Sequence, residues 1–146
     1  MKRILLFGIL SLTVLVSCQK KSDENRDIDE FIGRWALVQT YDAEAGFTDY
    51  YDSSGSMLVI DEETCALFFC VLENNPPFHD GYYDCSEEYF EQFFTFSCHA
   101  IDGTLFFTDD PDWGFLQKRD GKIYFYDSED VTTNYEIYER VMGFKK

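Results

Sequence analysis

The sequence of 146 residues contains none of the short motifs that mark common hydrolases. Neither Gly-x-Ser-x-Gly nor His-Glu-x-x-His occurs in it. Histidine is rare, with two in the chain, and one of them, His99, follows Cys98 directly. Neighbouring side chains of a strand point to opposite faces, so these two residues cannot form a catalytic dyad. We therefore expect that the protein is not an enzyme.

The sequence also lacks a pattern for binding a metal or a cofactor. It has no Cys-x-x-Cys and no ordered pair of histidines, which argues against a zinc site. The acidic stretch at 109–114 is similar to a calcium loop only in its charge, because the alternating ligands and the distal glutamate are missing. We expect a solvated acidic turn there, with no metal and no cofactor.

Basic residues are scarce. The chain has 12 lysines and arginines against 28 acidic residues, a formal net charge of −16. A field of this sign repels phosphates over about a Debye length, roughly 8–10 Å. We therefore exclude nucleic acid as a partner and expect the domain to stand away from anionic lipid head groups. The field attracts cations and basic partners, although its simplest explanation is that it keeps an aromatic-rich domain soluble.

The longest apolar run of the sequence lies at the start of the chain. Residues 4–16 are largely apolar and follow the basic pair Lys2 and Arg3. A run of 13 residues is too short to cross a bilayer, which takes roughly 20 residues. The segment is therefore typical of a removable signal. It ends in Leu-Val-Ser-Cys at positions 15–18.

This ending resembles the lipobox of bacterial lipoprotein signal peptides. The resemblance implies that residues 1–17 are a signal peptide cleaved just before Cys18, and that Cys18 carries a lipid anchor in the membrane. Two or more acyl chains hold a protein on a membrane more firmly than one chain does. Aspartate is absent after Cys18, which favours the bacterial outer membrane. Whether the protein lies on the periplasmic face or on the cell surface is left undetermined. Residues 18–30 are polar, as expected of a lipidated tether.

Four further cysteines, Cys65, Cys70, Cys85 and Cys98, suggest two disulfides in an exported chain. Cys65 and Cys70 fall in one expected strand and would lie about 16 Å apart, whereas a disulfide needs Cα atoms within roughly 4.4–6.8 Å. They cannot bridge each other. Either Cys65 pairs with Cys85 and Cys70 with Cys98, or Cys65 pairs with Cys98 and Cys70 with Cys85.

The rest of the chain reads as short strands separated by turn residues, without a long amphipathic helix. Two Asp-Gly pairs, at 102–103 and 120–121, are strong signals for tight hairpins. The residues at 86–94 predict one short helix or an early start of the next strand. The expected strands are 34–41, 57–60, 64–72, 93–100, 104–108, 115–118, 122–126 and 135–141.

Eight strands in sequential order predict an all-β fold, an eight-stranded up-and-down antiparallel barrel. An open sandwich would give the same pattern. The residues left after removal of the signal are enough for one compact domain, at 31–146, and we expect a monomer.

The two ends of this domain resemble lipocalins, the wider calycin group, and more closely the lipocalin-like lipoproteins of Bacteroidetes. Residues 31–35, Phe-Ile-Gly-Arg-Trp, are similar to the Gly-x-Trp start of these proteins, and 138–141, Tyr-Glu-Arg-Val, to their last strand. The resemblance implies that Arg140 lies over Trp35 at the closed end of the barrel, and that Gly33 allows the close approach. Such a stack stabilises by about 0.5–2 kcal/mol and is a structural latch. The segment 72–86 has no counterpart in the family pattern.

The lipocalin resemblance also implies a function, the binding of a small hydrophobic or amphipathic ligand in an apolar cup. Aromatic residues make up 18% of the chain, more than one core face requires. The mouth of the cup would be formed by loops such as 74–84 and 109–114. The sequence does not identify the ligand-binding residues. The alternative is a filled barrel that acts as a surface interaction or adhesion module and contacts protein or glycan through tyrosines such as those at 50–51 and 82–83.

Overall fold

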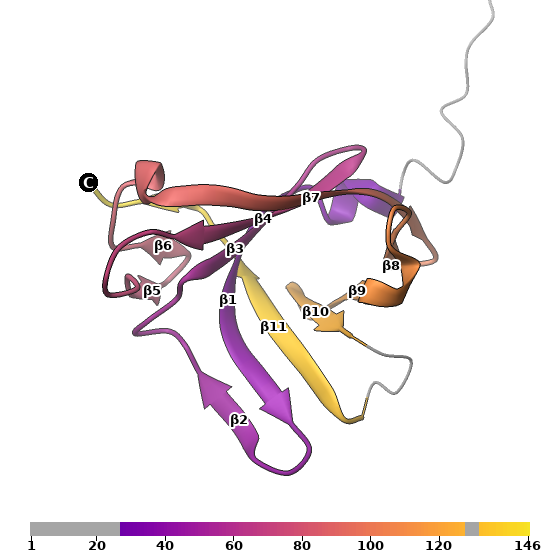
Figure 1. The fold of residues 1–146 in the computed structure, drawn as a ribbon, viewed down its shortest axis with the longest axis horizontal. Coiled ribbons are helices and arrows are strands. Elements are labelled where there is room, and N and C mark those ends of the chain that lie inside the picture. Colours follow the sequence, from indigo (N-terminus) through magenta and orange to yellow (C-terminus); the bar gives the residue numbers. More distant parts are fainter. Residues whose placement is uncertain (1–26, 128–131) are drawn as a thin grey trace, which may run out of the picture.

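A computed structural model describes residues 27–127 and 132–146 of the chain (Figure 1). The expected signal peptide at 1–17, the lipidation site Cys18 and most of the tether at 18–30 lie outside the described residues. These expectations therefore stay predictions. No helix in the described ranges is both long and apolar enough to cross a membrane.

The described chain forms a closed barrel of eight antiparallel strands (Figure 1). Each strand pairs with the next one along the barrel, and the last strand returns to pair with the first. The predicted eight-stranded antiparallel barrel with sequential strand order is thus confirmed. In order around the barrel, the strands are β1 (Gly33–Asp42), β3 (Ser56–Ile60), β4 (Thr64–Cys70), β7 (Phe90–Ile101), β8 (Thr104–Phe107), β9 (Phe115–Arg119), β10 (Lys122–Tyr126) and β11 (Asn134–Arg140).

Both predicted Asp-Gly hairpins are present. Asp102 and Asp120 have φ angles of 52° and 50°, and the glycine after each also has a positive φ. Two consecutive residues with positive φ define the type I′ turn, whose twist matches that of the strands it joins. A third turn of this kind, at Asp80, connects the short strands β5 (Phe78–His79) and β6 (Tyr82–Tyr83).

The ambiguous segment at 86–94 contains both of its expected elements. A 3-10 turn, η2 (Glu87–Tyr89), is followed at once by β7, which starts three residues before the predicted strand. The other helical elements in the described ranges are the 3-10 turns η1 (Ile28–Glu30) and η3 (Pro111–Trp113). A bulge in β7 at Phe93, between Gln92 and Phe94, shifts the register with β4 by one residue.

One end of the barrel is closed by the residues that precede β1. Ile28 and Phe31 are both buried in the barrel interior. The carboxylate of Asp27 accepts a hydrogen bond of 2.7 Å from the backbone of Asp102, which ties this segment to the β7–β8 turn. The last residues of the predicted tether therefore lie against the barrel.

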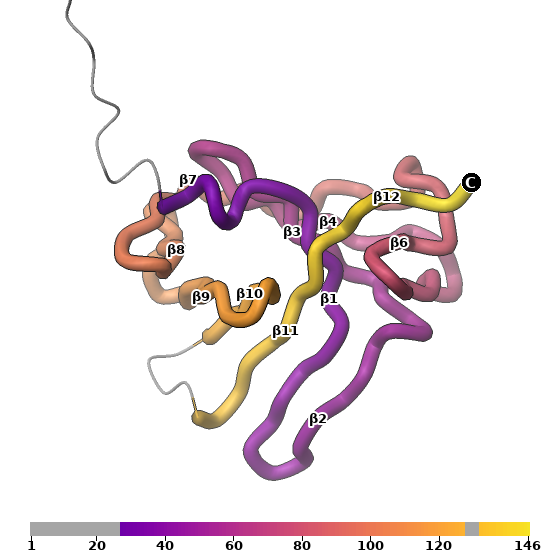
Figure 2. The backbone as a smooth tube through the Cα atoms, turned by 180° about the vertical axis from the view of Figure 1, so that it is seen from behind, coloured from indigo at the N-terminus to yellow at the C-terminus, as the bar shows by residue number. Residues whose placement is uncertain are grey.

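A second hydrophobic cluster lies outside the barrel. We call it the outer layer, and it consists of buried residues from the outward faces of the barrel strands and from the segments that cover them. A small sheet of β5, β6 and β12 (Gly143–Phe144) contributes to it, and Figure 2 shows this sheet beside the barrel wall. The buried members are Ala36, Val38, Met57, Phe78, Tyr83, Phe90 and Ile137.

The outer layer explains the segment at 72–86, for which the family pattern has no counterpart. We expected part of this segment to form the mouth of the cup, whereas its strands β5 and β6 cover apolar side chains on the outside of β1 and β3. Tyr83 is fully buried there, and its hydroxyl donates a hydrogen bond to the carbonyl of Ser56 at 3.1 Å. Strand β2 (Gly46–Asp49), also unpredicted, extends the sheet by pairing with β1.

Removing a buried side chain from the outer layer should destabilise the whole fold. We expect Phe78→Ala to lower the free energy of unfolding by about 3–5 kcal/mol, because the ring is fully buried and its loss leaves a cavity. Phe47→Ala is a matched control on an exposed hairpin and should lower it far less. Chemical denaturation of the two variants measures the difference, and equal losses would mean that the outer layer does not stabilise the barrel.

Candidate functional site

Arg140 and Trp35 meet at the closed end of the barrel. The guanidinium carbon of Arg140 lies 4.5 Å from the centroid of the Trp35 ring, and Trp35 is fully buried. The indole nitrogen of Trp35 donates a hydrogen bond to the carbonyl of Phe31 at 2.7 Å, and Arg140 donates one to the carbonyl of Ile32 at 3.1 Å. These contacts connect the first strand, the last strand and the segment that closes the barrel.

Gly33 has a specific reason to be glycine. Its φ is +141°, a conformation that other residues rarely adopt. A Cβ atom built on it would also lie 2.7 Å from Nη1 of Arg140. Any side chain at this position would therefore strain the backbone and push the guanidinium away from Trp35.

Variants at the closed end can separate the backbone strain at Gly33 from its steric conflict with Arg140. We expect Gly33→Ala to lower the free energy of unfolding by about 1–3 kcal/mol. In a background that already carries Arg140→Ala, the same change should lower it less, because the steric conflict is gone and only the backbone strain is left. Denaturation curves of the two single variants and the double variant measure this. A purely additive result would show that Gly33 and Arg140 do not act on each other.

The barrel interior contains a partly open cavity of about 240 Å³. We call it the barrel cavity. Its walls are mainly apolar and come from seven of the eight barrel strands and from η3. The lining residues are Leu37, Ser56, Leu58, Leu67, Phe69, Phe107, Trp113, Leu116, Phe125, Glu136 and Tyr138.

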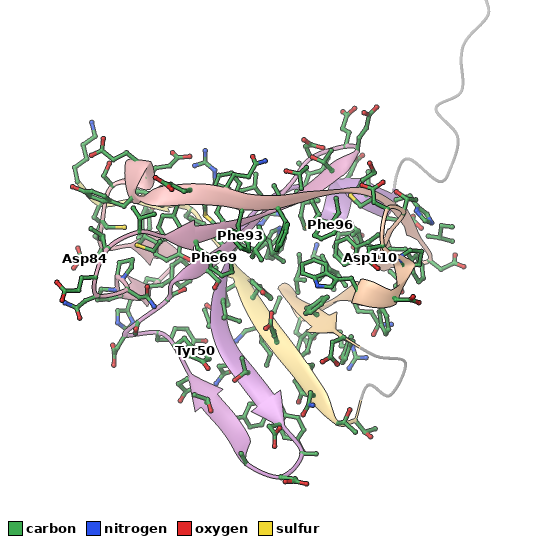
Figure 3. All side chains as sticks on the ribbon, in the orientation of Figure 1. Tyr50, Phe69, Asp84, Phe93, Phe96 and Asp110 are labelled. Atoms are coloured by element: carbon green, nitrogen blue, oxygen red, sulfur yellow. The ribbon has the colours of Figure 1, made fainter. Side chains whose placement is uncertain are left out.

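Aromatic rings form part of the rim of the barrel cavity. The Phe69 ring, which lines the cavity, lies 5.3 Å from the ring of Phe93, and Phe93 lies 4.4 Å from Phe94. Figure 3 shows Phe69 and Phe93 close together beneath β7. On the other side, Trp113 stacks on Phe96 at 4.3 Å between centroids. Of the two loops expected at the mouth, 109–114 contributes a lining residue, Trp113, whereas 74–84 contributes none.

Two polar side chains of β11 face the barrel cavity. The hydroxyl of Tyr138 donates a hydrogen bond of 2.5 Å to Oε2 of Glu136. Burial raises the pKa of Tyr138 well above its usual value, so this hydroxyl keeps its proton across the physiological range. Burial is also the largest influence on Glu136 and raises the pKa of its carboxyl, assisted by the charge of Asp127 and opposed by the hydrogen bond from Tyr138.

A second hollow of about 250 Å³ lies next to the barrel cavity, and we call it the outer hollow. It shares Phe125 and Glu136 with the barrel cavity, so Glu136 lies where the two spaces meet. Its other lining residues include two carboxylates and two tyrosines, namely Asp42, Asp127, Tyr41 and Tyr135. The sequence analysis did not single out any of these residues or Glu136.

The four cysteines carry free thiols in the structure, so the two predicted disulfides are not formed in it. Their positions nevertheless separate them into two pairs. Cys65 and Cys98 belong to the barrel interior, on neighbouring strands, whereas Cys70 and Cys85 pack against the outer layer. Burial and the neighbouring Cys98 raise the pKa of the Cys65 thiol. Burial and the neighbouring Cys70 raise the pKa of Cys85 to about 11.

This grouping favours one of the two open pairings. We expect oxidation by a small disulfide such as oxidised glutathione to join Cys65 with Cys98 and Cys70 with Cys85, by thiol–disulfide exchange that releases two reduced thiols per bond. The reaction should be slow in the folded protein, because the raised pKa leaves little thiolate. Peptide mapping by mass spectrometry identifies the links. Cys65→Ser should abolish the first link and leave the second, and a link between Cys65 and Cys85 would contradict the grouping.

The acidic stretch at 109–114 contains the 3-10 turn η3. Asp109 accepts a hydrogen bond of 2.7 Å from the backbone of Ser97, and Asp110 precedes the 3-10 turn η3. Within residues 27–127 and 132–146, no three His, Cys, Asp or Glu side chains come close enough together to hold a metal ion. A role of this stretch is to place Trp113 in the wall of the barrel cavity.

The fold and the cavity define a class: an all-β, closed, eight-stranded antiparallel barrel with an internal space, compatible with a lipocalin-like fold. Comparison of the chain with known protein families, with curated proteins and with solved structures gives no match. The assignment of the site therefore depends on the geometry described above.

Proposed function

We propose that the protein binds a small apolar or amphipathic molecule in the barrel cavity. The observation that carries this proposal is the cavity itself, with its mainly apolar and aromatic walls and a few polar groups at one side. Its volume of about 240 Å³ lies below the roughly 300–1,000 Å³ of pockets for drug-sized ligands. The ligand is therefore compact, with a single small ring system rather than a long acyl chain.

We also propose that the protein works at the bacterial cell envelope, held on the outer membrane by lipid on Cys18. Support for this comes from the apolar run at 4–16 and the lipobox-like ending before Cys18. A binding protein tethered in this way keeps its ligand near the membrane without entering it. The protein has no proposed catalytic step.

Binding can be followed with a tryptophan that lies in the cavity wall. The chain has two tryptophans, of which Trp113 lines the barrel cavity and Trp35 is buried at the closed end. We expect 1-naphthylmethanol, a neutral probe, to change the fluorescence of the unlipidated chain from Gln19 to Lys146, which keeps every described residue. Trp113→Phe should abolish that change.

A matched pair of serine variants tests the location of the probe. Ser56→Phe places a ring in the barrel cavity and should weaken probe binding at least tenfold, about 1.4 kcal/mol. Ser97→Phe adds the same ring at an exposed position of β7 and should leave binding unchanged. If both variants bind the probe as tightly as the wild-type chain, the cavity is not the binding site.

A surface interaction module, contacting protein or glycan, is the second candidate. The observation that favours it is the exposure of Phe93 and Phe94, at 62% and 48%, on the rim of the barrel cavity. Of the four tyrosines expected to make such contacts, Tyr83 is buried and the Tyr51 hydroxyl is bound to Glu139 at 2.7 Å, whereas Tyr82 is exposed. Absence of probe binding in the barrel cavity would favour this candidate.

A further inference from the structure

We propose that the ligand of the barrel cavity is a cation, an organic ammonium compound whose charged group meets the carboxylate of Glu136 while its apolar body lies among the aromatic walls. This inference depends on the proposed binding function and names the chemical class of the ligand. The observation behind it is a cavity-lining carboxylate that has a hydrogen-bond donor but no counter-ion.

Glu136 has one oxygen engaged and one available. Oε2 accepts the hydrogen bond from Tyr138, and within the described ranges Oε1 has no hydrogen-bond partner. Each ion pair formed by a described lysine, arginine or histidine goes to another carboxylate: Arg34 to Glu87, His79 to Asp52, Lys118 to Glu30 and Lys122 to Glu139. The charge of Glu136 is thus left for a ligand to neutralise.

A purely structural role would not require a charge at this position. The buried Tyr138 hydroxyl needs an acceptor, but a neutral amide oxygen would serve as well. A carboxylate in an apolar wall is destabilised by desolvation, which is the physical cause of its raised pKa. An ammonium group that enters the cavity would offset this cost, because it supplies both the opposite charge and a donor for Oε1.

The surroundings of Glu136 select against an anionic ligand. Asp127 lies near enough to raise the pKa of Glu136, and both Asp127 and Asp42 line the adjoining outer hollow. A ligand carboxylate at this place would face three like charges, with the net charge of −16 of the whole chain behind them. Fatty acids and similar anions are therefore disfavoured relative to cations at this place.

Aromatic rings beside the carboxylates also suit a cation. The outer hollow is lined by Tyr41 and Tyr135, and Phe125 lines both spaces next to Glu136. The faces of such rings attract ammonium groups, and more strongly where water is displaced. An apolar ring on a short linker to an ammonium group would thus place each of its parts against a suitable wall.

Three probes of the same size and different charge test the proposal. We would measure, by calorimetry on the unlipidated chain from Gln19, the affinities of 1-naphthylmethylamine, 1-naphthylmethanol and 1-naphthoate at pH 7.5. We expect the amine to bind at least tenfold more tightly than the alcohol, a factor that corresponds to about 1.4 kcal/mol. The naphthoate should bind more weakly than the alcohol.

Two isosteric variants identify the carboxylate that is responsible. Glu136→Gln keeps an acceptor for Tyr138 and should remove the preference for the amine over the alcohol. Asp127→Asn removes a more distant charge and should reduce the preference only in part. If the alcohol binds and the amine has no advantage, the charge assignment fails but the binding function stands. If none of the probes binds, the binding function itself fails.

The pH dependence gives an independent readout. The titratable and charged groups around Glu136 are Tyr138 and Tyr135 on the same strand, Asp127 after β10, Tyr41 and Asp42 at the end of β1, and Arg119 of β9, whose charge acts on Tyr135. A proton on Glu136 competes with the ammonium group, so the affinity for the amine should fall as the pH drops through the raised pKa of this carboxyl. The affinity for the alcohol should stay constant. A parallel loss for both probes would indicate unfolding rather than titration of the site.

Discussion

The pairing of β11 with β1 is the interaction on which the rest of the structure depends. It joins the last long strand to the first, from Trp35 opposite Arg140 at one end to Asp42 opposite Asn134 at the other. Without it the sheet would be open, and the barrel cavity would be a groove with a wall missing. The same pairing brings Glu136 to the level of Thr40, well away from Trp35, and so places the carboxylate at the far side of the cavity from the closed end.

Much of this barrel could be predicted because its signals are local. Alternating side chains and the two Asp-Gly turns depend on neighbouring residues only, and the predicted strands agree with the observed ones to within a few residues. The outer layer could not be predicted in this way. Ala36 and Val38 occupy the face of β1 that points away from the barrel interior, and only the fold shows that a distant segment covers them.

Some residues of the candidate site could likewise be predicted from the sequence, and others could not. Trp35 and Arg140 could be singled out from the resemblance at the two chain ends, and the structure places them in contact. Glu136 carried no comparable signal, because one glutamate among 28 acidic residues is not distinctive. Its inward direction follows from its position two residues before Tyr138 in β11, but a charge is not expected on an inward face. The cavity forms only when the barrel closes, so a binding role for the Glu136 carboxylate can be recognised only in the folded structure.

The entry of the chain at the closed end bears on how the protein would be oriented on a membrane. Ile28 and Phe31 are held in the barrel interior beside Trp35, at the end opposite Glu136. If lipid on Cys18 anchors the protein, the residues before Asp27 allow a separation of at most about 30 Å between the bilayer and that end. The opening would then point away from the bilayer, and a ligand would arrive from the aqueous side rather than by lateral transfer from the lipid. A water-soluble cation travels by that route, whereas a membrane-dissolved lipid does not.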